Sequence, residues 1–208
     1  MSEGRATSLA DEMRDYIRGQ VAVGYLSADE IEEAVADVYL YDLRDSPLDP
    51  AILRRIAGVE IDKAFAGQID AQRQWPDVTD CDRLDRAFAA LDRGGIVARQ
   101  NFVCCQNCGH AEIGDEVYAA EKSGTNVIGY TFFHSQCTDG AVETGDLYLY
   151  YGSLQRDEPA SVRIGRAIAD ALERQGLVVE WNGRLDAAIL VKLNWRRRIS
   201  QRMAERKR

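Results

Sequence analysis

The chain of 208 residues is 46% hydrophobic and 29% charged, with a net charge of −8 at pH 7. This composition is ordinary for a soluble globular protein with a sizeable core. No stretch reaches the roughly 18 apolar residues of a membrane span, and the N-terminus lacks the apolar segment of a signal peptide. We therefore expect a cytoplasmic protein without a membrane partner.

The charge is unevenly distributed along the chain. The first 45 residues hold eleven acids against four arginines, whereas residues 196–208 hold seven bases against one acid. An acidic front half argues against a nucleic-acid groove, because phosphate contacts supply most of the affinity in such complexes. We expect no nucleic-acid partner except through the basic tail, residues 197–208. The simplest interpretation of that tail is a solvated, fraying helix end or a disordered terminus.

The first 95 residues have the apolar spacing of helices. The run from Leu9 to Val21 recurs at helical spacing, and Gly24 interrupts it. Three cap signals mark further helix starts: Ser27 with Glu30, Asp49 with Pro50, and Thr79 with Asp82. Trp75-Pro76 ends the third helix, because a residue before proline is pushed away from helical dihedral angles. An acidic helical region over residues 1–76 is the prediction.

From Ile96 onward the apolar period changes to that of strands alternating with helices. Strands are predicted over 96–104, 126–135, 146–153, 177–183 and 187–195, with helices over 108–124 and 160–176. The order β-α-β-β-α-β-β is that of a ferredoxin-like (split βαβ) sheet with an extra strand. The predicted class is therefore α+β, with this ferredoxin-like domain spanning residues 77–196.

Three phrases of the sequence are distinctive: WPDVTDCDRLDRAFAALDRGGIVARQNFVCCQNCGHAEI, GYTFFHSQCTDGAVETGDLYLYYG and VVEWNG. Through them the chain resembles, over most of its length, an uncharacterised bacterial family of unknown function. The resemblance implies no established activity. By topology alone, the order of elements is also similar to small regulators of ribonuclease activity, but function does not follow from fold.

Two short pairs of residues give the pattern of a zinc site, Cys105-x2-Cys108 and His134-x2-Cys137. Four ligands in two such pairs suit a tetrahedral zinc ion. In a split βαβ sheet the first and second strands run the same way with the third between them. Their C-terminal ends then lie on one edge, about 10 Å apart. Both pairs would follow those ends and close on one metal.

Two other interpretations of these residues stay open. Cys105 at the start of a helix would have a lowered thiol pKa, and His134 on the same edge would act as its base in a thiol enzyme or redox protein. Alternatively the cysteines only pack, since cysteine is among the most buried residue types; Cys81 is most simply structural. His110 is expected to face solvent.

No known catalytic motif, phosphate loop or dinucleotide fingerprint is present in the sequence. A binding or regulatory role is therefore favoured over an enzyme. The expected partner is another protein or a second copy of the chain, and the helical region is the candidate interaction module.

Overall fold

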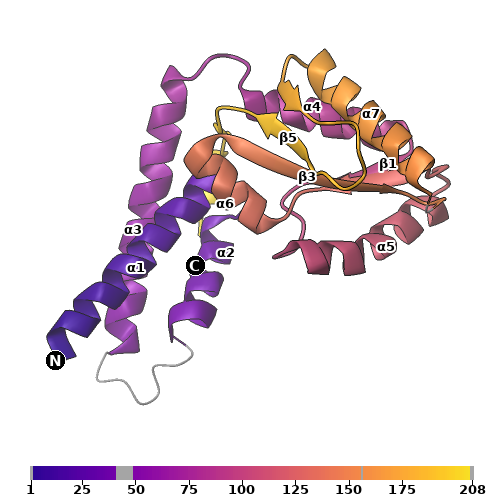
Figure 1. Ribbon diagram of the computed structural model, residues 1–208. Coiled ribbons are helices and arrows are strands. Elements are labelled where there is room, and N and C mark those ends of the chain that lie inside the picture. Colours follow the sequence, from indigo (N-terminus) through magenta and orange to yellow (C-terminus); the bar gives the residue numbers. More distant parts are fainter. Residues whose placement is uncertain (1, 41–48, 156, 207–208) are drawn as a thin grey trace. The chain divides into compact units, whose positions relative to one another are not determined.

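Figure 1 shows the computed structural model, which describes residues 2–40, 49–155 and 157–206. The chain divides into two compact units. The helical unit comprises Met1–Pro76 with Arg196–Arg208, and the sheet unit comprises Asp77–Trp195. Asp42 and Asp45 of the acidic front half, and the last two residues of the basic tail, lie outside the described residues.

In its described residues, the helical unit contains three main helices and three short helical segments. They are α1 (Ser2–Val23), α2 (Ala28–Val35), the π-helical turn η1 (Ala36–Leu40), α3 (Pro50–Ala71), the 3-10 turn η3 (Gln72–Gln74) and α8 (Gln201–Ala204). The predicted caps are confirmed. Ser27 and Glu30 form both arms of a capping box at α2, and the Asp49 side chain accepts the Ala51 N–H at α3.

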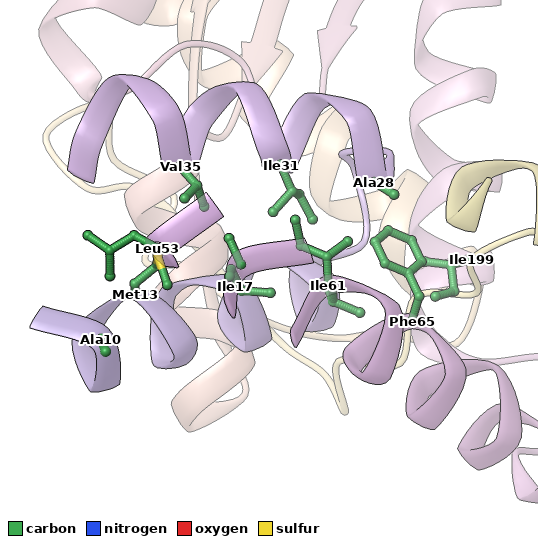
Figure 2. Close-up of a cluster of buried hydrophobic side chains, with 12 residues drawn as sticks. Ala10, Met13, Ile17, Ala28, Ile31, Val35, Leu53, Ile61, Phe65 and Ile199 are labelled. Carbon is green, nitrogen blue, oxygen red and sulfur yellow. The ribbon is translucent and has the colours of Figure 1, made fainter. Parts of the chain in front are cut away.

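The core of the helical unit lies between α1, α2 and α3 (Figure 2). Each helix turns one apolar stripe inward, as its i, i+3, i+4 spacing requires. The buried members are Ala10, Met13, Ile17, Val21, Ala28, Ile31, Val35, Leu53, Ala57, Ile61, Phe65 and Ile199. The last of these comes from the opposite end of the chain, so the basic tail contributes to this core.

The tail is held by specific contacts and is not simply solvated. The backbone N–H and C=O of Ile199 bond to the side-chain amide of Gln72, at 3.1 and 2.9 Å. Arg206 pairs with Asp62 at 2.8 Å and with Glu32 at 3.5 Å. The expectation of a solvated tail is therefore wrong for these residues, because one isoleucine within a basic run is enough to anchor it.

Replacing Ile199 with alanine is expected to cost the helical unit about 2–4 kcal/mol, because it leaves a cavity in a closed core. Ile52→Ala is the matched control, since Ile52 is 47% exposed while Ile199 is 3% exposed. The control should stay within about 0.5 kcal/mol of the parent chain. Chemical denaturation followed by circular dichroism measures both, and equal losses would contradict the anchoring role of Ile199.

The sheet unit alternates helices and strands. Its elements are α4 (Asp80–Arg93), β1 (Ile96–Arg99), α5 (Gln106–Lys122), β2 (Gly129–Phe132), α6 (Ser135–Thr144), β3 (Asp146–Ser153), α7 (Glu158–Arg174), β4 (Val178–Glu180) and β5 (Ile189–Lys192). The capping box of Thr79 and Asp82 opens α4 as predicted. The predicted α+β class is confirmed, since a helical N-terminal region is followed by a mixed five-stranded sheet.

The ferredoxin-like detail of the prediction is not confirmed, because the strand order is β1-β2-β3-β5-β4. Strands β1 and β2 are direct parallel neighbours, and β3 pairs antiparallel with the other side of β2. The third strand therefore does not lie between the first two. Beyond the strands, Phe102 N–H donates to Phe133 O at 2.8 Å and Phe133 N–H donates to Arg99 O at 3.2 Å. This direct pairing leaves no space for an intervening strand.

Helices cover both faces of the sheet (Figure 1). α4 and α7 pack on one face, while α5 and α6 lie on the other, against β1, β2 and β3. Phe132 of β2 and Tyr150 of β3 are paired in register and belong to the face that α5 covers. Among the described residues, no helix is long and apolar enough to cross a membrane.

Candidate functional site

The site lies where β1 and β2 end, because parallel strands bring their C-terminal ends to the same edge of the sheet. The ends are neighbours, one strand spacing of about 4.8 Å apart, and not the two spacings that the sequence predicted. Ser135 joins the loops that follow. Its N–H donates to Val103 O and its hydroxyl donates to Cys104 O, both at 3.1 Å.

The loop after β1 has unusual backbone geometry. Asn101 and Val103 have φ angles of 47° and 52°, in the left-handed region. For a β-branched residue this conformation is an outlier that costs about 1–3 kcal/mol and persists only where neighbours hold it. Here the Thr138 hydroxyl donates to Asn101 Oδ1 at 2.8 Å. The strained loop turns the chain sharply into Cys104 and the first turn of α5.

Three cysteine sulfurs meet at this turn. The Sγ atoms of Cys104, Cys105 and Cys108 all lie within 4.8 Å of one another, and those of Cys104 and Cys108 are 3.5 Å apart. Two sulfurs bound to one tetrahedral zinc ion are about 3.8 Å apart, given Zn–S bonds of about 2.3 Å. Cys104 is exposed and the other two are half-buried. The three sulfurs can therefore hold a metal ion without leaving their present positions by much.

The three thiols differ in acidity. The backbone N–H of Cys108, and next the Cys108 thiol, lower the pKa of Cys105, which is the N-cap residue of α5. Hydrogen bonds with Cys104 and Cys105 raise the pKa of Cys108 to about 12. Cys105 is therefore the first of this pair to become a thiolate, which is the form that attacks electrophiles and binds metals.

His134 and Cys137 form a separate pair at the start of α6. His134 is the N-cap residue of that helix, and its Nε2 lies 3.3 Å from Cys137 Sγ. Both side chains are buried, at 5% and 8% exposure. The His134 ring stacks on Tyr150 with 5.5 Å between centroids and 16° between planes. Its Nδ1 is buried and has no hydrogen-bond partner among the described residues.

The structure thus brings the predicted site residues together as two pairs. Cys105 lies with Cys108, and His134 lies with Cys137. In the described part of the chain, the sulfurs that all lie within 4.8 Å of one another are those of Cys104, Cys105 and Cys108. His134 and Cys137 are not members of this group. Sequence reasoning missed Cys104 as a ligand. The adjacent cysteines of the Cys104-Cys105-x2-Cys108 run were the available signal.

The neighbours of the cluster fix how α5 lies on the sheet. Gly109 is buried, and a Cβ atom on it would overlap the Phe132 ring. The absence of a side chain there lets α5 approach β2 closely. His110 is exposed, as expected, but its ring also lies edge-on to Phe132, with 5.2 Å between centroids. Gly109 and Phe132 together set the position from which Cys105 and Cys108 project.

Fold and site together define an α+β protein with a cysteine cluster that can hold a metal ion, placed at the ends of two parallel strands. A family model described as "Domain of unknown function (DUF6891)" matches residues 6–199. The chain belongs to this family, as the resemblance seen in the sequence indicated. No curated protein and no solved structure matches the chain.

Proposed function

We propose that this protein binds one thiophilic metal ion, preferably zinc, through Cys104, Cys105 and Cys108, and that it acts as a binding or regulatory protein. The observation that carries the proposal is the approach of three sulfurs to within 4.8 Å. Thiolates are soft ligands that favour zinc, copper(I) and iron–sulfur clusters over magnesium or calcium. The donor set therefore fits zinc, with these three residues as ligands.

The electrostatics of the cluster favour a cation. The Cys108 pKa of about 12 arises from sulfurs crowded together, and a bound cation reverses that effect by stabilising the thiolates. Metal binding should accordingly release protons, because each cysteine ligand must lose one. Three protein ligands leave the fourth position of a tetrahedral ion for water or for a group from elsewhere. We propose that a partner protein, or a second copy of the chain, supplies that group.

Protein purified without chelator is expected to carry about one zinc ion per chain. Changing any one of Cys104, Cys105 or Cys108 to serine should weaken zinc affinity by at least about 100-fold, since even the loss of an outer-shell contact costs 10–100-fold. Elemental analysis and competition with a chromogenic chelator provide the two measurements. Cys81→Ala is the control, because Cys81 is buried at 1% exposure and is outside the cluster.

The same chelator competition distinguishes the three-cysteine ligand set from the ligand set predicted by sequence. Suppose that zinc is held by Cys105, Cys108, His134 and Cys137. His134→Gln should then weaken zinc binding as much as Cys108→Ser does, whereas Cys104→Ser should leave zinc binding unchanged. Zinc below about a tenth of an equivalent in the parent chain, against the one ion that such a site holds, would exclude both sets.

A thiol–disulfide function is the second candidate, and the geometry of Cys105 and Cys108 favours it. Cys105 is the N-cap residue of α5 and has a lowered pKa, while Cys108 lies in the first turn and has a raised pKa. A low-pKa cysteine at a helix start, followed after two residues by a second cysteine, is the arrangement of redox motifs. His134 Nε2 contacts the thiol of Cys137, so this candidate rests on the cysteine pair and not on a Cys105–His134 dyad.

A third candidate, packing alone, suits Cys81 best. Cys81 is buried in α4, whereas the three cluster cysteines are exposed or half-buried. All five cysteines are outside disulfide bonds in the part of the chain that the structure describes. Reduced thiols of this kind are typical of the cytoplasm, which we propose as the compartment.

A further inference from the structure

A pocket of about 380 Å³ lies between α6 and β3, next to the pair formed by His134 and Cys137. Both residues of the pair line it, together with Gln136, Gly140, Asp146 and Tyr148. This volume is at the small end of the range for ligand sites, about 300–1,000 Å³. The pocket therefore suits a small molecule, and it places a thiol and an imidazole where that molecule would lie.

The thiol and the imidazole are poised for proton transfer. Burial lowers the pKa of His134 and raises that of Cys137, so both groups are neutral near pH 7. The 3.3 Å between Sγ and Nε2 is a hydrogen-bond distance for sulfur. In the tautomer with the ring proton on Nδ1, the thiol donates to Nε2; Nδ1 itself is buried and has no partner in the described residues. A neutral nucleophile beside a neutral base is the arrangement of serine–histidine pairs.

We propose that this pocket is a second chemical site, in which Cys137 is the nucleophile and His134 its base, acting on a small uncharged acyl compound such as a thioester. Acyl transfer is favoured over disulfide exchange because, within the described residues, the side chains that hydrogen-bond to the Cys137 thiol are those of His134 and Tyr150 and not a second thiol. An uncharged substrate is favoured because the carboxylate of Asp146, which lines the pocket, is already paired with Lys192 at 3.0 Å and offers no free charge to a substrate.

The step balances without an oxidant or a metal. Sγ of Cys137 attacks the acyl carbon while its proton passes to His134 Nε2, so that a new S–C bond forms. The bond from the acyl carbon to the leaving thiol then breaks, and the proton passes from Nε2 to the departing sulfur. Water or another thiol removes the acyl group from Cys137 in the reverse manner. This site does not use Cys104, Cys105 or Cys108 and does not depend on the proposed metal.

The test uses p-nitrophenyl acetate as the acyl donor and the full chain as the protein. Acetylation of each cysteine is followed by peptide mapping with mass spectrometry. Cys137 is expected to be acetylated much faster than Cys81, which is buried at 1% exposure and serves as the internal control. In a chain with Cys104, Cys105 and Cys108 changed to serine, the initial burst of p-nitrophenolate should equal one per chain and should disappear with Cys137→Ala.

Two further variants test the roles of the base and the pocket. His134→Gln should slow acetylation of Cys137 by roughly 100-fold or more, the typical contribution of a general base. His134 is buried at the N-cap position of α6, so a thermal melt must show that this variant folds. Gly140→Leu is the second variant, because a Cβ at this pocket-lining glycine meets no atom within 4 Å. It should obstruct the pocket and slow acetylation at least tenfold, with the pair itself intact.

Acetylation of Cys137 no faster than that of Cys81 would overturn the site. Equal rates in the parent chain and folded His134→Gln would overturn the role of the base, and equal rates with Gly140→Leu would overturn the pocket. None of these outcomes bears on zinc content, so failure of this site and failure of the metal site are separately visible.

Discussion

Gly109→Ala is expected to destabilise the sheet unit by about 1–3 kcal/mol, the usual cost of forcing extra atoms into a packed core. A Cβ at Gly109 overlaps the ring of Phe132, which is fully buried and has no room to move away. The first turn of α5 must then lift from β2, so the zinc affinity of the cysteine cluster should fall in the same variant. Denaturant unfolding and chelator competition measure the two effects.

Gly114→Ala is the matched control within the same helix. Gly114 is exposed, and a Cβ there meets no atom within 4 Å. Because alanine is favoured over glycine in a helix interior by about 0.8–1.0 kcal/mol, this control should stabilise the chain. The two variants thus have effects of opposite sign. A stabilised Gly109→Ala chain would show that α5 does not need its close approach to Phe132.

In metal-free protein at neutral pH, iodoacetamide is expected to label Cys105 far faster than Cys108. The pKa of Cys108 is raised to about 12, which lowers its thiolate fraction roughly 10³-fold relative to an ordinary thiol. The greater nucleophilicity of a high-pKa thiolate recovers part of this, so a net ratio of about 50-fold or more is expected. The pKa of Cys105 is lowered, which increases the ratio further.

The expected difference in labelling rate does not come from solvent exposure, because Cys105 and Cys108 are both half-buried. As the pH rises, labelling of Cys105 should level off above its lowered pKa, while that of Cys108 continues to rise. Bound zinc should protect both residues, and Cys81 should stay slow throughout. Equal rates for Cys105 and Cys108 in metal-free protein would remove the thiol–disulfide candidate and leave the metal proposal standing.

Cap signals predicted the starts of α2, α3 and α4 correctly, because a cap depends only on residues close together in the sequence. The capping box of Thr79 and Asp82 needs only residues three apart, and both arms form, with Thr79 N–H donating to Asp82 Oδ2 at 2.7 Å. The start of α5 has no such signal: its N-cap residue Cys105 makes no side-chain capping bond, and the helix begins at Gln106, before the predicted span of 108–124. A cap is satisfied within one turn, whatever the rest of the chain does.

Strand pairing and the membership of the site were not predictable in this way. The position of β3 outside the β1–β2 pair depends on contacts between distant residues, and several sheets share one order of elements. Cys104 joins the cluster because Val103 adopts a left-handed φ, which is a conformation that valine avoids. The backbone preference of valine therefore predicts against a turn at Val103, and tertiary contacts impose that turn nonetheless.

The placement of Ile199 in the core of the helical unit has a consequence for the order of events during synthesis. The ribosome completes α1, α2 and α3 first, then all of the sheet unit, and only afterwards Ile199. The sheet unit, contiguous over Asp77–Trp195, can close as soon as it emerges. The helical unit must wait, with one end of its core uncovered, until Ile199 is made. A chain that stops before Ile199 is thereby exposed to proteases in its first helices, although the missing segment lies beyond the whole sheet unit.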